Sequence, residues 1–332
     1  MAVHSASRDS LSGPLLVDAK LRAPPLREGM ISRPHLVTLL NSGADCKLTL
    51  LSAPTGFGKT TLLAQWRAAE EHNKPFAWVS LDAGDKDPVR LLTYVVEAVD
   101  RIEPGFGDGM RMLLRSGEVD FGNVVLPRLV NEIASLSRRI VVVFDDYDLL
   151  MKDGPNHLTS FIIEYLPETV QFVISTRTKP SISLGRLRAS GGLVEIRGSD
   201  LAFGEEEAGA LMRATLGRAD VDSEDLRILL AKTEGWPAGL YLAALSLRDA
   251  PDVSTAIRDF AGNDRHVVDY LTEEVVERQP PKLRRFLFKT SILERFCAPL
   301  CDAVTGEDDA AELLKDIEQS NLFLVPLDEH RQ

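Results

Sequence analysis

The stretch LTLLSAPTGFGKTTLLAQW, residues 48–66, decides the fold of this chain. Its first five residues form a short apolar run that is typical of a buried parallel strand, and residues 60–71 place apolar side chains on one helical face. Between them, residues 53–60 match the Walker A pattern, except that Ala53 replaces its first glycine. A strand, a glycine-rich loop and a helix in this order predict a phosphate-binding loop, or P-loop.

The residue types in this loop suit a nucleotide phosphate chain. Gly56 and Gly58 let the backbone wrap closely around phosphates with its N–H groups pointing inward, and the following helix adds the positive end of its dipole. We expect Lys59 to bind the β- and γ-phosphates and Thr60 to ligate Mg²⁺. The other loop residues expected at the nucleotide are Thr55, Phe57 and Thr61. The shorter Gly56-Phe57-Gly58 alone would be weak evidence for a dinucleotide site.

Strands and helices alternate from this unit up to residue 200. Short apolar runs predict strands at 76–81, 140–144, 171–175 and 193–196, and helical periodicity predicts helices at 88–101, 123–137 and 157–166. Such alternation favours an α/β fold, a P-loop NTPase sheet of parallel strands with helices on both faces.

Two further strand ends supply candidate site residues. Residues 140–146 look like a Walker B strand, in which Asp145 would hold the Mg²⁺ shell and Asp146 would orient or polarise the attacking water. Arg177 closes the next strand, and ligands of parallel sheets lie beyond the carboxyl ends of the strands. A guanidinium there would be close to the γ-phosphate. The alternatives are two aspartates that end a strand at a solvated turn, and a surface arginine in a loop.

After residue 200 the strands give way to helices, predicted at 205–215, 223–232, 237–247, 254–260 and through 264–319, before one terminal strand at 321–327. Residues 1–20 resemble a flexible tail, and Pro24, Pro25 and Pro34 exclude long regular structure from 21–34. We therefore divide the chain into a tail (1–20), a nucleotide-binding domain (21–200), a helical domain (201–262) and a C-terminal domain (263–332).

Composition excludes several classes of protein. The net charge is −12, and residues 264–332 hold 9 Lys/Arg against 15 Asp/Glu, a net charge of −6. Neither the whole chain nor this C-terminal region has the positive charge that attracts nucleic acid, so DNA binding would need a domain absent from this chain. No apolar run approaches the roughly 18–20 residues of a membrane span. Cys46, Cys297 and Cys301 are too few for a disulfide framework, so we expect a reducing cytoplasm and ordinary packing.

Three weaker signals leave alternatives open. Residues 235–240, GWPAGL, open a helix with Pro237 near its first turn, which is either a site element or a plain helix start. Arg33 either touches the nucleotide or is an exposed linker residue. The acidic turn at 82–87 is interpreted as a solvated loop, except for Asp82, which lies nearest the strand end.

Several segments together resemble a known family. They are APTGFGKTTLLAQW (53–66), WVSLDAGDKDPVRLLTYV (78–95), VVVFDDYDLL (141–150), FVISTR (172–177), LRASGGLVEIRGSDLAFGEEEA (187–208) and TEGWPAGLYLAALS (233–246). In this order they are similar to the nucleotide-binding part of the MalT-like regulators, which are large ATP-binding LuxR-type transcription activators in the STAND class of signal-transduction ATPases. The resemblance runs from about residue 21 to residue 327.

The resemblance implies roles for residues at matching positions. Lys59 and Thr60 fall on the phosphate and Mg²⁺ positions, Asp145 and Asp146 on the paired Walker B acids, and Arg177 on the arginine that senses the γ-phosphate. Pro237 falls on a proline that packs against the base, and Arg33 near a segment that lines the pocket. The C-terminal domain would be a winged helix.

The resemblance also implies a switch. ADP would hold a closed monomer, ATP would open it and allow self-association under the control of an inducer or regulatory protein, and slow hydrolysis would reset it. The chain departs from the family in stopping at His330-Arg331-Gln332, before the family's second wing strand and its His-containing motif, and it lacks the sensor and DNA-binding domains. This suggests either an excised fragment or a short relative, and the unpaired last strand favours the fragment. The rival hypothesis is an ordinary turnover ATPase or P-loop kinase, although the sequence offers neither an acceptor site nor a lid.

Overall fold

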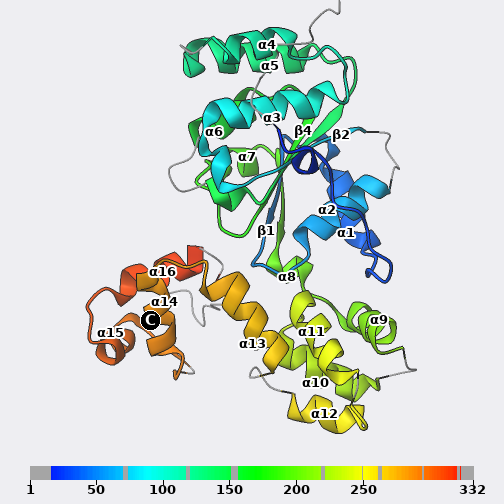
Figure 1. The fold of residues 1–332 in the computed structure, drawn as a ribbon, viewed down its shortest axis with the longest axis vertical. Coiled ribbons are helices and arrows are strands. Elements are labelled where there is room, and N and C mark those ends of the chain that lie inside the picture. Colours follow the sequence, from blue (N-terminus) through cyan, green and yellow to red (C-terminus); the bar gives the residue numbers. More distant parts are fainter. Residues whose placement is uncertain are drawn as a thin grey trace, which may run out of the picture.

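A parallel sheet of five strands forms the centre of the computed structural model, which describes residues 16–69, 74–116, 120–150, 156–217, 221–248, 250–260, 264–293, 295–319 and 322. The strands run in the order β2-β3-β4-β1-β5. They are β1 (Leu48–Ser52), β2 (Phe76–Ser80), β3 (Ile140–Asp145), β4 (Val170–Thr176) and β5 (Leu193–Arg197). Helices lie on both sides of the sheet (Figure 1), which confirms the predicted α/β fold.

Each face of the sheet has its own apolar layer, because side chains alternate along a strand. On β1, Leu48 and Leu50 join one layer and Leu51 joins the other. The first layer includes residues of α3 (Pro88–Asp100), α4 (Asp108–Leu114), α5 (Leu126–Ala134), α6 (Asn156–Tyr165) and α7 (Leu184–Ala189). The second includes residues of α1 (Pro34–Ser42), α2 (Lys59–Ala68) and α8 (Gly198–Leu201).

The strand order brings three loops together. β4 pairs with β1 on one side and with β3 on the other, and all three strands are parallel. Their carboxyl ends therefore share one edge of the sheet, which is where ligands of such sheets bind. Lys59 follows β1, Asp145 ends β3 and Arg177 follows β4, so the predicted site residues of the sheet meet at this edge.

The N-terminal segment differs from the flexible tail that we predicted up to residue 20. Residues 1–15 lie outside the described residues. From Leu16 the chain packs against the sheet domain, and a 3₁₀ turn at Asp18–Leu21 buries Lys20 and Leu21. This segment is ordered against the sheet domain because Lys20 forms an ion pair with Asp85, whose carboxylate is fully buried.

The helical domain has a separate core and lies at the lower right of Figure 1. Its helices are α9 (Glu205–Leu216), α10 (Ser223–Thr233), α11 (Pro237–Leu247) and α12 (Val253–Asp259). Leu211, Leu229, Leu240 and Ile257 are buried in this core, one from each helix. The four predicted helices are therefore present within a residue at each end.

A connecting helix leads to the C-terminal domain at the lower left of Figure 1. It consists of α13 (Arg265–Leu271) and a π-helical turn, η6 (Thr272–Val276). The domain then forms α14 (Pro281–Thr290), α15 (Ala298–Thr305) and α16 (Ala310–Gln319), with Cys301 buried in its core, in line with ordinary packing. The strand predicted at 321–327 lies almost wholly outside the described residues. Within the described ranges, no helix is long and apolar enough to cross a bilayer.

Candidate nucleotide-binding site

The Walker A loop closes around its own lysine. Gly56 and Gly58 adopt φ angles of 78° and 77°, which favour glycine, and Gly58 forms the N-cap of α2. Lys59 is buried, and its ammonium group donates to the carbonyl oxygens of Ala53 at 2.7 Å and Pro54 at 2.9 Å. The cation therefore lies inside the loop that is predicted to hold phosphates.

Burial shifts the ionisation of two site residues in opposite directions. It lowers the pKa of the Lys59 ammonium group to about 8, with a further contribution from the positive charge of Arg177. It raises the pKa of the Asp145 carboxyl to about 6, with a further contribution from the negative charge of Asp146. Both shifts disfavour the charged forms, as expected for groups removed from water. A phosphate and a metal ion would favour the same charged forms.

Thr60 and Asp145 fit a magnesium ion. The Thr60 hydroxyl lies 2.9 Å and 3.1 Å from the two carboxylate oxygens of Asp145, and Asp145 is only 2% exposed. A hydroxyl and a carboxylate side by side are the hard oxygen ligands that Mg²⁺ prefers, usually completed by water and phosphate oxygens. Among the described residues there is no cluster of His, Cys, Asp and Glu that suggests a different metal site.

An arginine–carboxylate group lies beside this pair. One Nη of Arg177 is 3.8 Å from Asp146, and its Nε is 3.8 Å from Asp148. Asp148 also accepts a hydrogen bond from the backbone N–H of Arg177 at 3.0 Å. Asp146 has a φ of 58°, an uncommon conformation that turns the chain sharply after β3. Asp148 was not predicted as a site residue, although it lies only three residues after Asp145.

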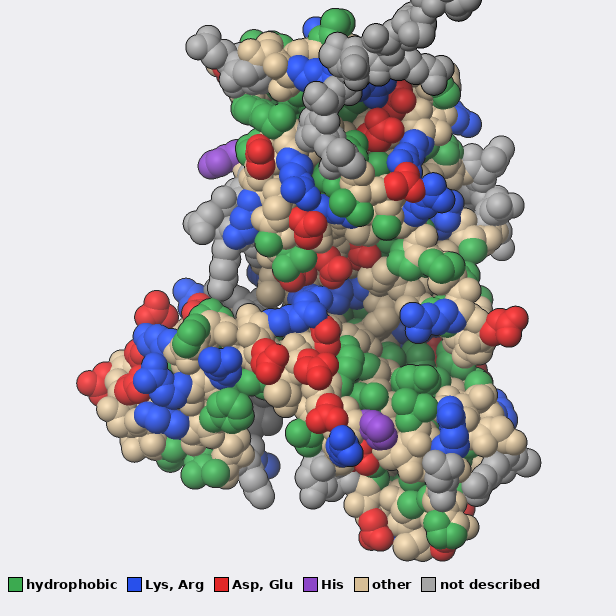
Figure 2. All heavy atoms as spheres, viewed as in Figure 1, with side chains coloured by type: hydrophobic (Ala, Val, Ile, Leu, Met, Phe, Trp, Pro, Cys, Tyr) green, Lys and Arg blue, Asp and Glu red, His purple; other side chains and the backbone are tan. Residues whose placement is uncertain are grey.

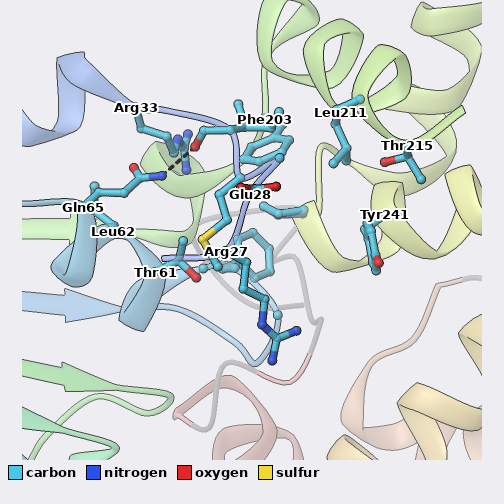
Figure 3. A pocket seen from close by; sticks show the side chains of 18 of the residues that line it. Arg27, Glu28, Arg33, Thr61, Leu62, Gln65, Phe203, Leu211, Thr215 and Tyr241 are labelled. Carbon is cyan, nitrogen blue, oxygen red and sulfur yellow. Dashed lines mark hydrogen bonds between the residues drawn. The ribbon is translucent and has the colours of Figure 1, made fainter. Parts of the chain in front are cut away.

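A cavity of about 460 Å³ opens between the P-loop, residues 27–33 and the helical domain (Figure 3). The P-loop and α2 contribute Gly56, Phe57, Gly58, Thr61 and Leu62. The helical domain contributes Phe203, Leu211, Thr215, Pro237 and Tyr241. Apolar walls with a few polar groups are typical of sites for flat organic ligands such as nucleobases. Pro237, which is predicted to contact the base, thus lines the same cavity as the P-loop residues Gly56, Phe57 and Gly58.

Arg33 lines this cavity, but its guanidinium group is already bonded. It donates to both carboxylate oxygens of Glu207, at 2.8 Å and 3.2 Å, and to the carbonyl oxygen of Leu201 at 2.7 Å. It also lies 5.1 Å from the ring of Phe203. The alternative of an exposed linker residue is wrong, since Arg33 is buried and is bonded to the helical domain. Its contact with the nucleotide stays a prediction, since Arg33 also lines the cavity.

The start of α11 touches the phosphate loop directly. The indole N–H of Trp236 donates to the carbonyl oxygen of Thr55 at 3.1 Å, and the N–H of Ala238 donates to that of Gly56 at 3.1 Å. A Cβ atom at Gly56 would come within 2.6 Å of the Trp236 indole nitrogen, so only glycine fits. The GWPAGL segment therefore contacts the P-loop, while a role of Pro237 at the base stays a prediction.

The acidic turn after β2 is structural. We interpreted 82–87 as a solvated loop, which is wrong for Asp85: its side chain is fully buried and pairs with Lys20 and Arg90. Asp82 pairs with Lys20 at 3.0 Å. The carboxylates of this turn thus anchor the N-terminal segment.

Three comparisons relate the chain to known proteins. Residues 272–332 match the MalT winged helix domain. The chain is 32% identical over 318 residues to the HTH-type transcriptional regulator MalT of Yersinia pestis, and 32% identical over 296 residues to the serine/threonine-protein kinase PknK of Mycobacterium tuberculosis. These alignments cover 95% and 89% of this chain, but only 35% and 27% of the relatives, so the chain spans between about a quarter and a third of their length.

The fold is also found in a solved structure. A Walker-type ATPase of Pyrococcus abyssi superposes with a TM-score of 0.58 at 16% sequence identity, covering 93% of this chain and 94% of that protein. This likeness shows the P-loop ATPase fold.

Proposed function

Because the chain is a MalT-like P-loop ATPase module, we propose that it binds ADP or ATP with Mg²⁺ between its sheet domain and its helical domain and switches shape with the nucleotide. The supporting observation is the cavity that Gly56–Gly58 and Pro237 line together. A nucleotide with its phosphates in the loop and its base in this cavity would touch both domains. It would become part of the interface between them.

Each candidate residue has a role in this proposal. The backbone of the P-loop and Lys59 bind the phosphates, Thr60 and Asp145 hold Mg²⁺, and Arg177 contacts the terminal phosphate. Thr55, Phe57 and Thr61 line the loop, and Pro237 packs against the base. When bound, Mg²⁺ would neutralise phosphate charge and align the phosphate chain. Asp146 would orient the water that attacks the terminal phosphate.

The contacts between domains favour a switch over simple turnover. Trp236 and Ala238 bond to the backbone of Thr55 and Gly56, so movement of the helical domain must change the contacts of the phosphate loop. A ligand shifts such an equilibrium only by the difference in its affinity for the two states. At 100 times its dissociation constant, a ligand that binds only one state contributes about 2.7 kcal/mol. We propose that ADP favours the closed arrangement, and that ATP favours an open, self-associating one.

The relatives suggest that this module is combined with different output domains. Nearly the same part of the chain matches a protein named as a transcription regulator and one named as a protein kinase. A nucleotide switch is a role that both could share. We favour a transcription regulator because residues 272–332 match the MalT winged helix domain. DNA would then be contacted by a domain outside this chain, with an inducer or regulatory protein as partner.

Nucleotide binding is the first test. Mass spectrometry of the nucleotide released from purified, denatured protein should identify ADP or ATP. Calorimetry should then show that Lys59→Ala abolishes nucleotide binding, while circular dichroism shows an unchanged fold. Equal ATP affinity for Lys59→Ala and the parent would refute the assignment of the P-loop.

The second test separates the switch from the rival turnover ATPase or kinase. Small-angle scattering and size-exclusion chromatography should show a compact monomer with ADP and a more open, self-associating species with ATP and Mg²⁺. Rapid multiple-turnover hydrolysis without any change in shape or assembly would support the rival.

A further inference from the structure

A second cavity, of about 640 Å³, is lined by other residues of the P-loop than the base cavity. The base cavity touches Gly56, Phe57, Gly58 and Thr61, whereas the second cavity touches Pro54 and Thr55. A nucleotide that enters through the base cavity and follows the loop would therefore direct its last phosphate toward the second cavity. The sheet domain also lines it with Arg177 and Asp148, next to the Walker B strand end.

The opposite wall of this cavity belongs to the segment between α13 and α14. Glu274, Val275, Arg278 and Gln279 line it there. The segment is held against the P-loop, because Tyr270 of α13 packs on Trp236 with ring centroids 5.6 Å apart, and Trp236 bonds to Thr55. Its π-helical turn buries Val275. Such turns are uncommon and are often found at functional sites.

More cations than carboxylates line the cavity, although the chain is acidic. Its charged lining comprises the cations Lys86, Arg177, Lys179, Arg278 and Lys282, and the carboxylates Asp148, Glu274 and Asp316. Cations are therefore in excess in a chain whose net charge is −12. Figure 2 shows Lys and Arg side chains gathered with acidic ones where the sheet domain meets the rest of the chain. A phosphate group fits this charge balance.

Arg278 is the cation best placed to respond to that phosphate. It pairs with Glu274 at 2.6 Å while its side chain stays 45% exposed, so the guanidinium is not locked in a core. Arg278 lines the same cavity as Arg177 and Asp148, which lie beside the Walker B strand end.

We propose that Arg278 binds the terminal phosphate of ATP from the C-terminal side of the cavity, and that Glu274 holds Arg278 when that phosphate is absent. The inference rests on the proposed function. A guanidinium fork suits phosphate oxygens and can exchange one anionic partner for another. ATP would therefore replace the Glu274–Arg278 pair with a phosphate–Arg278 pair and bring a negative charge close to the Glu274 carboxylate. ADP would leave the pair intact, so this segment distinguishes the two nucleotides.

Calorimetry with ADP and with a non-hydrolysable β,γ-imido analogue of ATP, both with Mg²⁺, tests the inference on the whole chain. Arg278→Ala should weaken binding of the ATP analogue by about tenfold, with less than a twofold change for ADP. Glu274→Gln should strengthen analogue binding, because it frees Arg278 and removes a like charge. The matched control is Arg285→Ala, an exposed arginine on α14 that does not line the cavity, which should change neither affinity.

Two outcomes would overturn the inference. One is an equal loss of ADP and analogue binding in Arg278→Ala, which would mean a general structural role. The other is an unchanged ratio of the two affinities in both Arg278→Ala and Glu274→Gln. Failure of the proposed function would look different, since the parent itself would then bind neither nucleotide.

Discussion

Asparagine in place of Asp145 should stabilise the nucleotide-free protein while it removes the proposed magnesium ligand. Asp145 is buried, and burial together with the charge of Asp146 raises the pKa of its carboxyl from 3.8 to about 6. Its ionised form is therefore less favourable in the folded chain than in the unfolded chain. Asp145→Asn keeps the size of the side chain, and its amide oxygen can still accept from the Thr60 hydroxyl.

The size of the effect follows from this shift. A rise of about two pKa units corresponds to about 3 kcal/mol of folding free energy. Part of this gain is offset because Lys59 loses a nearby negative charge. We therefore expect Asp145→Asn to raise the free energy of unfolding by roughly 1–3 kcal/mol at neutral pH.

The pH dependence has a definite sign. Below about pH 4 the carboxyl is protonated in both the folded and the unfolded parent, so the parent and the variant should be equally stable. Between about pH 4 and 6 unfolding releases a proton, and the parent loses stability relative to the variant as pH rises. The full difference is present above about pH 6.

Urea unfolding without nucleotide or Mg²⁺, followed by tryptophan fluorescence, measures the difference, since Trp66 and Trp78 are buried in the sheet domain. The control is Glu168→Gln, which removes an exposed carboxylate before β4 and should change little. At pH 7.5 the midpoint of Asp145→Asn should exceed that of the parent, and at about pH 3, below both pKa values, the two should coincide. A variant that is equal to the parent or less stable at pH 7.5 would refute the argument that Asp145 is kept for its ligand chemistry at a cost in stability.

Three other changes have defined outcomes. Asp146→Asn should retain Mg·ATP binding but slow hydrolysis, because Lys59, Thr60 and Asp145 are unchanged; hydrolysis at the parental rate would remove Asp146 from the role of orienting water. Pro237→Arg should weaken ADP binding and enlarge the radius of gyration measured with ADP, because a long cation would enter the base cavity; a variant with parental affinity and radius would leave Pro237 as a helix-start residue only. The chain should not bind duplex DNA specifically, because residues 264–332 have a net charge of −6; a salt-sensitive, sequence-dependent shift in a gel assay would contradict this.

The sheet could be predicted from local sequence because its signals are local. Apolar runs such as 140–144 form strands buried on both faces, and the predicted strand bounds differ from the observed ones by a residue or less at each end. The order of the strands was not predicted; in the structure it places Lys59, Asp145 and Arg177 at one edge of the sheet. Short helices such as α4 and α7 were missed, because seven or six residues give too little periodicity to recognise.

Contacts between distant parts of the chain could not be predicted in this way. Arg33 meets Glu207 across 174 residues, and Trp236 meets Thr55 across 181. Lys20 meets Asp85 across 65 residues, which turned a segment that looked mobile into an anchor. Such pairs form only when folded parts of the chain pack against each other. A sequence pattern can therefore identify the charged or aromatic residue but not its partner.

The central claim is that an adenine nucleotide binds across the P-loop and the helical domain. Photolabelling with an azido-adenine analogue of ADP, followed by peptide mass spectrometry, tests it most directly. The label should attach to residues 27–33 and to peptides containing Pro237 or Tyr241, which line the base cavity. Excess ADP should abolish this labelling, and so should Lys59→Ala. Labelling confined to other parts of the chain, or unaffected by excess ADP, would contradict the account.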